Sequence, residues 1–347
     1  MSLALAACSS SEEPVGRRTT AVPVSPTPRA TPLPEVSPVA QLGSEDRPLT
    51  LAFVLPIDDR DTQTAAAAND LETWLLGELG VTVSVTFVNN DSEALRAICS
   101  ETEDASPTAA WVSAFTVMAA ESACGAEPVM GIVRGTGTRA AVGTAVELVG
   151  RAGLAALDAL RGQAICRVAG EDDLSTWIYP TLLLTGAGVN PFTDMPAPRE
   201  YESAADVVRA IYDGDCPAAA LPPDVYDDAL DDLESSLTGV SREQIEAAFT
   251  ILRPAGDPAP PRGASWSGYD TNVIPYDALV FPPSSVLPNE LREQIVAALS
   301  EHAESRDGRD LLDTVLDASA VIAVDAGDFG AFRAVVNQAN WDMTFAG

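Results

Sequence analysis

Short apolar runs alternate with amphipathic helical patterns after the first 50 residues. Leu51–Leu55 is an apolar run that predicts a buried strand. Ala65–Leu79 places apolar residues at three-to-four spacing before Gly80, as expected for a helix and its C-cap. Val81–Phe87 alternates as a second strand, and Ser92–Ile98 predicts a second helix. This order of strand, helix, strand and helix predicts a parallel sheet in an α/β fold.

The same alternation continues to the C-terminal region. Extended segments are predicted at Ala109–Val112, Val129–Val133, Ala140–Val149, Gln163–Val168, Ala218–Leu221 and Val273–Phe281. Helices are predicted at Phe115–Glu121, Leu154–Gly162, Trp177–Leu184, Ala204–Tyr212 and Pro288–His302. Gly256–Gly268 is rich in Pro and Gly and is interpreted as a linker, and the residues after His302 as an Ala-rich, Asp-rich tail.

The first 47 residues have a different character. Leu5-Ala6-Ala7-Cys8 resembles the lipobox at which bacterial lipoproteins are cut and acylated on cysteine, so residues 1–8 are interpreted as a truncated signal with Cys8 as the lipidation site. A full signal needs about 7 to 15 apolar residues, so we expect either a start codon further upstream or a shortened chain. A chance cysteine in a disordered tail is the alternative. Residues 9–47 predict a disordered spacer, because Ser9–Pro48 holds eight of the 26 prolines.

The charge of the chain limits its partners. Its 347 residues carry 51 acidic and 20 basic side chains, all of the latter Arg, for a net charge of −31. Nucleic acid and anionic lipid both require clustered positive charge, so we expect no nucleic acid and contact with a membrane only through the lipid anchor. No apolar run reaches the about 18 residues of a spanning helix.

Four cysteines remain when Cys8 is set aside, and an even number in an exported chain indicates disulfides. Three pairings are possible. We favour Cys99 with Cys124 and Cys166 with Cys216, because each pair would close a loop inside one domain. The spacings do not match a metal site, and no metal is expected.

Three further segments carry a family resemblance. They are the Leu154–Val168 segment, Ser175–Pro180, and Ile274–Val280 followed by Leu287–Leu291. In this order they resemble the phosphate, phosphite and phosphonate family of ABC-transporter substrate-binding proteins, over roughly 290 residues.

The resemblance implies an α/β, two-lobed periplasmic-binding-protein-like fold of type II, each lobe a mixed sheet flanked by helices. Lobe I would comprise residues 48–139 plus 272–347 and lobe II residues 140–271, with a small ligand bound between them and delivered to an ABC permease. No cofactor is implied, and we expect a monomer.

The ligand loop departs from the family pattern. Where the family has a Ser-Thr-Ser-Gly segment at a helix start, which binds an oxyanion, this chain has Asp173–Pro180, in which Ser175 alone keeps the family type. The acidic run Glu171–Asp173 would repel a phosphate. Phe115 also replaces a hydroxylated aromatic residue. These differences favour a cationic or zwitterionic ligand over a phosphonate.

By position, nine residues are the predicted ligand-binding set. They are Ile57, Asp58, Ser113, Phe115, Ser175, Thr176, Trp177, Tyr179 and Tyr276. Core packing is the alternative for each aromatic residue, and a solvated turn is the alternative for Asp58 and its acidic neighbours.

An enzyme is not expected. The single histidine, His302, is predicted to be exposed on a polar helix face, so a nucleophile would lack a positioned base. Nucleophile-elbow, P-loop and zinc-protease motifs are absent. Acidic pairs such as Asp227-Asp228 and Asp231-Asp232 are interpreted as a charged helix face.

The sequence thus predicts an extracytoplasmic, lipid-anchored solute-binding protein of an ABC importer. A ligand-sensing or surface interaction lipoprotein without a transport role is the alternative, and a secreted acidic hydrolase is a third class.

Overall fold

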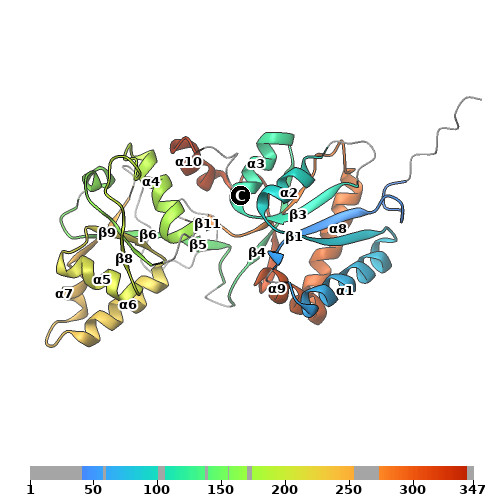
Figure 1. Ribbon diagram of the computed structural model, residues 1–347. Helices are drawn as coiled ribbons and strands as arrows, with labels where there is room; N and C mark the ends of the chain where they lie inside the picture. The colour runs from blue at the N-terminus through green and yellow to red at the C-terminus, as the bar shows by residue number, and fades with distance from the viewer. Residues whose placement is uncertain are drawn as a thin grey trace, which may run out of the picture. The chain divides into compact units, whose positions relative to one another are not determined.

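The computed structural model describes residues 41–57, 60–100, 106–136, 140–154, 156–169, 174–253 and 273–341. They belong to a unit that spans Ala40–Gly347. Two mixed sheets, of six and five strands, form its framework together with flanking helices (Figure 1). The predicted α/β class is confirmed. Cys8, most of the predicted spacer and the linker Gly256–Gly268 lie outside the described residues.

The six-stranded sheet combines early and late segments of the chain. Strand β1 pairs in parallel with both β2 and β3, whereas β12 is antiparallel to β3 and β4, and β13 is antiparallel to β4. Across the sheet the order is β13 (Ala320–Ala323), β4 (Glu127–Val133), β12 (Ala278–Phe281), β3 (Thr108–Val112), β1 (Leu49–Val54) and β2 (Val83–Val88).

Alternating side chains of this sheet enter two different cores. Leu51 and Phe53 of β1 belong to a cluster with α1 (Thr62–Leu79), α8 (Asn289–Glu304) and α9 (Arg306–Leu316). Ala52 lies between them and belongs to a second cluster, which includes side chains of the other three helices that pack on this sheet. These helices are α2 (Asp91–Ile98), α3 (Ala114–Cys124) and α10 (Gly330–Gln338). Because strand side chains alternate between faces, helices cover both faces of the sheet.

The five-stranded sheet is built from the middle of the chain. Strand β7 is parallel to β8 and β9, and β6 is antiparallel to β9 and β10. Its order is β10 (Phe249–Leu252), β6 (Glu147–Arg151), β9 (Ala218–Leu221), β7 (Cys166–Val168) and β8 (Arg199–Tyr201). The same region contains α4 (Tyr179–Gly186), α5 (Ala204–Asp213), α6 (Pro223–Ser236), α7 (Arg242–Glu246), a 3-10 turn (Leu157–Leu160) and a π-helical turn (Leu174–Ile178).

A third, two-stranded sheet is formed by β5 (Gly143–Ala145) and β11 (Val273–Pro275). In chain order each of these strands lies between a strand of the six-stranded sheet and a strand of the five-stranded sheet. Strand β5 is antiparallel to β11. A Cβ atom on Gly143 would lie 2.4 Å from the carbonyl oxygen of Ile274, so this close approach of two backbones requires glycine.

Both predicted disulfides are confirmed. Cys99, which ends α2, is bonded to Cys124, the last residue of α3. Cys166, the first residue of β7, is bonded to Cys216, which precedes β9.

Three expectations need correction. His302 is buried, with 9% of its surface exposed, and its ring lies 4.3 Å from that of Trp74, because α8 packs against α1 and α9. The Ala-rich, Asp-rich tail forms α9, β13 and α10, so it contributes a strand and two helices. Order also begins earlier than predicted, since residues 41–47 form a turn in which Gly43 N–H donates to Arg47 O at 2.8 Å.

Candidate functional site

The carboxyl ends of β1, β2 and β3 share one edge of the six-stranded sheet, which we call the carboxyl edge. Strand β1 pairs with β2 on one side and β3 on the other, and the connecting helices α1 and α2 enter different cores. The sheet therefore changes its winding direction between β1 and β3, which is where open α/β sheets bind ligands. Antiparallel pairing of Ala278 with Val112 and Gly131 brings the start of β12 and the end of β4 to the same edge.

Two residues of the carboxyl edge form an internal hydrogen-bonded pair. Asp91 begins α2, and Ser113 is the N-cap residue of α3. The Ser113 hydroxyl donates to Asp91 Oδ2 at 2.6 Å, and the Ser113 backbone N–H lies 3.3 Å from Oδ1. The positive end of the α3 dipole also favours an anion here. Both donors of Ser113 are thus already bound to a carboxylate of the protein.

A second carboxyl group lies at the same edge. Asp277 directly precedes β12 and is partly buried. Burial and, to a smaller extent, the negative charge of Asp91 raise the pKa of the Asp277 carboxyl and Arg134 lowers it, so that the pKa moves from 3.8 to about 6. The Arg134 guanidinium lies 4.6 Å from the ring centroid of Tyr276, and its Nε is 3.7 Å from Asp317 Oδ2. Within the described part, this edge carries more acidic than basic groups.

In the five-stranded part, Trp177 lies among aromatic and charged groups. The Arg167 guanidinium lies 5.1 Å from the Trp177 ring centroid, and Phe192 contacts that ring edge-on with centroids 6.2 Å apart. Arg167 also pairs with Glu200, with Nη2 and Oε1 2.6 Å apart. An internal cation therefore already uses the π system of Trp177.

The remaining predicted residues occupy different environments. Phe115 and Tyr179 are buried, and their rings pack on Phe332 of α10 at centroid distances of 5.0 and 6.4 Å. Thr176 is also buried, whereas Ile57 is 68% exposed. Asp58, the acidic run Glu171–Asp173 and the side chain of Ser175 lie outside the described residues. Ligand binding by the predicted set stays a prediction.

Sequence reasoning missed Asp91, Asp277, Arg134 and Arg167. Asp277 lies inside the Ile274–Val280 segment, and Asp91 follows the clearly alternating second strand, so both positions carried a signal. Arg134 and Arg167 carried none, because only the fold places their guanidiniums over Tyr276 and Trp177.

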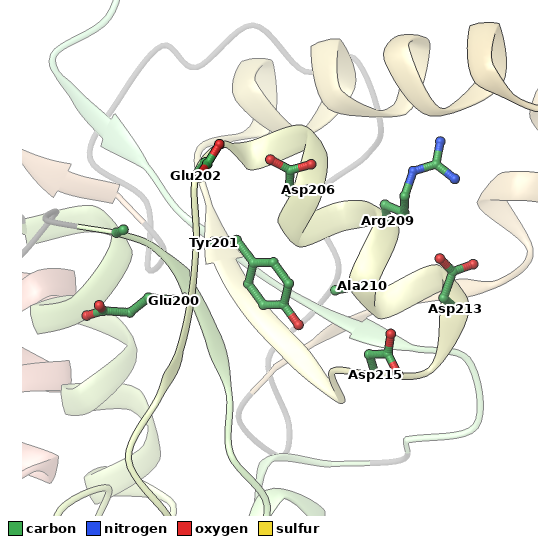
Figure 2. A pocket seen from close by; sticks show the side chains of 9 residues that line it. Glu200, Tyr201, Glu202, Asp206, Arg209, Ala210, Asp213 and Asp215 are labelled. Carbon is green, nitrogen blue, oxygen red and sulfur yellow. The ribbon is translucent and has the colours of Figure 1, made fainter.

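The surface also contains an acidic cavity of about 470 Å³ on the five-stranded part. Figure 2 shows Tyr201 beside α5, with Asp206, Asp213 and Asp215 on or just after this helix. Glu200 and Glu202 complete the acidic lining, and Arg209, the one basic lining residue, donates a hydrogen bond to Ser236. This cavity adds negative potential to the surface around α5.

Residues 41–341, with their gaps, contain no group of three or more His, Cys, Asp or Glu side chains placed to hold a metal ion. In the same part of the chain, no helix has the length and apolar character needed to cross a bilayer.

Comparisons with solved structures return several binding proteins. A binding-protein component of an ABC phosphonate transporter from Pseudomonas aeruginosa is 13% identical, with a TM-score of 0.44 over 85% of this chain and 87% of that one. PhnD1 from Prochlorococcus marinus, solved with methylphosphonate, is 14% identical, with a TM-score of 0.43 over 84% and 98%. The aliphatic sulphonate-binding protein SsuA from Escherichia coli is 13% identical, with a TM-score of 0.37 over 84% and 85%.

No curated protein matches the sequence significantly. A family model described as "ABC transporter, phosphonate, periplasmic substrate-binding protein" matches residues 53–329. This range includes every strand of the two large sheets except most of β1, which begins at Leu49. The chain therefore belongs to the family of periplasmic substrate-binding proteins of phosphonate ABC transporters.

Proposed function

We propose that this protein is the lipid-anchored, extracytoplasmic binding component of an ABC importer. A small ligand would bind between a lobe of residues 48–139 plus 272–347 and a lobe of residues 140–271, and pass to an ABC permease. Family membership supports the import role. The lipobox-like Leu5–Cys8 supports an anchor at Cys8. The protein would act as a monomer without a cofactor.

We infer that the ligand is an organic amine, cationic or zwitterionic, rather than a phosphonate. The observation that carries this inference is the Asp91–Ser113 pair, because the hydroxyl and the backbone N–H of Ser113, the N-cap residue of α3, are bound to a carboxylate. Asp277 adds a second acidic group to the same edge. An ammonium group would complement the negative charge of this edge.

Charge repulsion is large enough to decide between the two ligand classes. One carboxylate about 4 Å from a phosphonate oxygen costs about 4 kcal/mol at an effective dielectric constant of about 20. That free energy corresponds to roughly a thousandfold loss of affinity. An ammonium group at the same distance would gain a comparable attraction, reduced by the cost of removing it from water.

Isothermal titration calorimetry of the full chain with choline and with methylphosphonate tests this inference. We expect the wild type to bind choline more tightly, and Asp91→Asn to lower choline affinity at least tenfold. Asp70→Asn is the matched control, since Asp70 is exposed on α1, and it should leave both affinities unchanged. Tighter binding of methylphosphonate to the wild type would refute the amine assignment while leaving the import role intact.

A sensing or surface interaction role without transport is the second candidate. The Asp173–Pro180 segment favours it, because it departs from the Ser-Thr-Ser-Gly segment with which the family binds its transported anion. Uptake of labelled ligand by the native host, with and without this gene, separates the two roles. Equal uptake in both strains, or the absence of permease and ATPase genes beside this gene, would support the sensing role.

A further inference from the structure

We propose that the protein has a second binding site, for a small organic carboxylate, at the amino ends of β7, β8 and β9. A cavity of about 440 Å³ lies there, lined by residues that precede or begin these strands, such as Gln163, Pro196 and Pro217. Small-molecule sites commonly have volumes of about 300 to 1,000 Å³. The π-helical turn with Trp177 follows the opposite, carboxyl end of β7, so this cavity is separate from the candidate site.

Two guanidiniums line the cavity. Arg151 ends β6, and its Nη1 lies 3.0 Å from the position that a Cβ atom of Gly214 would take. Gly214 has φ +84° and ends α5, so glycine at this turn allows the Arg151 side chain to lie against the backbone. Arg199 begins β8 and donates one hydrogen bond to the carbonyl oxygen of Asp215.

These guanidiniums lack acidic partners. Among the described residues, no carboxylate lies within 4.0 Å of either one, and the Arg151 side chain makes no hydrogen bond there. Six other arginines of the described residues form ion pairs with Asp or Glu, namely Arg134, Arg161, Arg167, Arg242, Arg292 and Arg333. In a chain with 51 acidic side chains, two cations without a carboxylate partner in one cavity are available to a ligand anion.

The lining indicates the class of anion. Arg151 and Arg199 contribute two positive charges and Asp215 one negative charge, so the lining carries a net charge of +1, which matches a monoanion better than a dianion. Guanidinium groups bind carboxylates through paired hydrogen bonds. Pro196, Pro217 and neighbouring alanines form the apolar part of the lining, which suits a small apolar body attached to the carboxylate.

Covalent and backbone links hold the walls of this cavity in place. The disulfide between Cys166 and Cys216 joins the segment after Ala164 to the segment that holds Asp215. Arg151 N–H donates to Pro217 O at 2.8 Å, and Arg199 N–H donates to Ile165 O at 2.9 Å. A site whose walls are already positioned loses little conformational entropy on binding.

Calorimetry and ligand-observed NMR with benzoate, benzamide and inorganic phosphate test the proposal on the full chain. We expect benzoate to bind more tightly than phosphate or the neutral benzamide, with an affinity that falls as salt is added. Arg151→Ala and Arg199→Ala should each lower benzoate affinity at least tenfold. Asp215→Asn should raise benzoate affinity several-fold, because the substitution removes a negative charge from the cavity lining. Asp215 also lines the acidic cavity of Figure 2.

Arg209→Ala is the matched control, since Arg209 lies on α5, lines the acidic cavity and donates to Ser236. It should leave benzoate affinity unchanged, and circular dichroism should show that all variants are folded. Absence of benzoate binding, equal binding of benzamide, or full affinity in both Arg151→Ala and Arg199→Ala would overturn the proposal. Asp91→Asn should not change benzoate binding, so this outcome is independent of the amine inference.

Discussion

Replacing Asp277 by Asn should stabilise the folded protein at neutral pH. The Asp277 carboxyl is partly buried at the start of β12, and the Asp91 carboxylate lies near enough to disfavour its charge. Folding therefore places a charge where a neutral group would be favoured. Asn keeps the size and polarity of the side chain and removes that charge.

The magnitude follows from the change in pKa. Burial, together with the nearby charge of Asp91 and against that of Arg134, raises the pKa of Asp277 from 3.8 to about 6. At about 1.4 kcal/mol per pH unit this corresponds to about 3 kcal/mol at high pH. Because the side chain keeps some contact with solvent, screening reduces the effect, and we expect about 1 to 3 kcal/mol.

The direction of the pKa shift also determines how the free energy of unfolding depends on pH. Between pH 6 and 3.8 the folded protein binds a proton at Asp277 that the unfolded chain does not, so this group increases stability as pH falls. The advantage of Asp277→Asn should therefore be largest at pH 8 and absent below about pH 3.8.

Urea unfolding of the wild type and Asp277→Asn at pH 8, 6 and 4 measures this profile. Asp310→Asn, on the exposed surface of α9, is the control for loss of one negative charge and should show no such pH dependence. An Asp277→Asn variant that is no more stable than the wild type at pH 8, or whose advantage does not change with pH, would refute the reasoning.

Two further stability effects follow from the packing. Burial lowers the pKa of His302 below its usual 6.5, so protonation of this residue should destabilise the wild type as the pH falls below 6.5. His302→Phe keeps a ring beside Trp74 and should remove this loss of stability. A denaturation series from pH 8 to 5 compares the two proteins. Gly143→Ala should lower the free energy of unfolding by about 1 to 3 kcal/mol, because the new methyl group would meet Ile274 O at 2.4 Å. Gly77→Ala on α1, where no atom lies within 4 Å, should be neutral or stabilising, and equal losses in both variants would contradict this account.

Local patterns in the sequence were sufficient for much of the fold. The alternating run Val81–Phe87 and the three-to-four spacing in Ala65–Leu79 correspond to β2 and α1, because each element must present one apolar face to a core. The boundaries differ by a few residues, as at α1, where Asp61 accepts hydrogen bonds from the backbone of the first turn and starts the helix at Thr62. The disulfide pairing was also predictable, since each pair links neighbouring elements of one region.

The candidate site was predictable only in part. Ser113 was identified from its place after a buried strand, but its partner Asp91 is 22 residues earlier in the chain. A sequence pattern of period two or 3.6 contains no information about which side chains meet across such a distance. His302 illustrates the same limit, because its neighbours on α8 are polar while the helix packing that buries it comes from α1 and α9.

The sequence by itself determined the α/β class, most strands and helices, the acidic character of the chain and the family resemblance, because these depend on composition and local periodicity. The tertiary structure alone decided that Asp91 holds the donors of Ser113, that Arg167 covers Trp177, and that Arg151 and Arg199 share one cavity. Each of these contacts joins segments that only the pairing of strands brings together, and both ligand proposals rest on their charges.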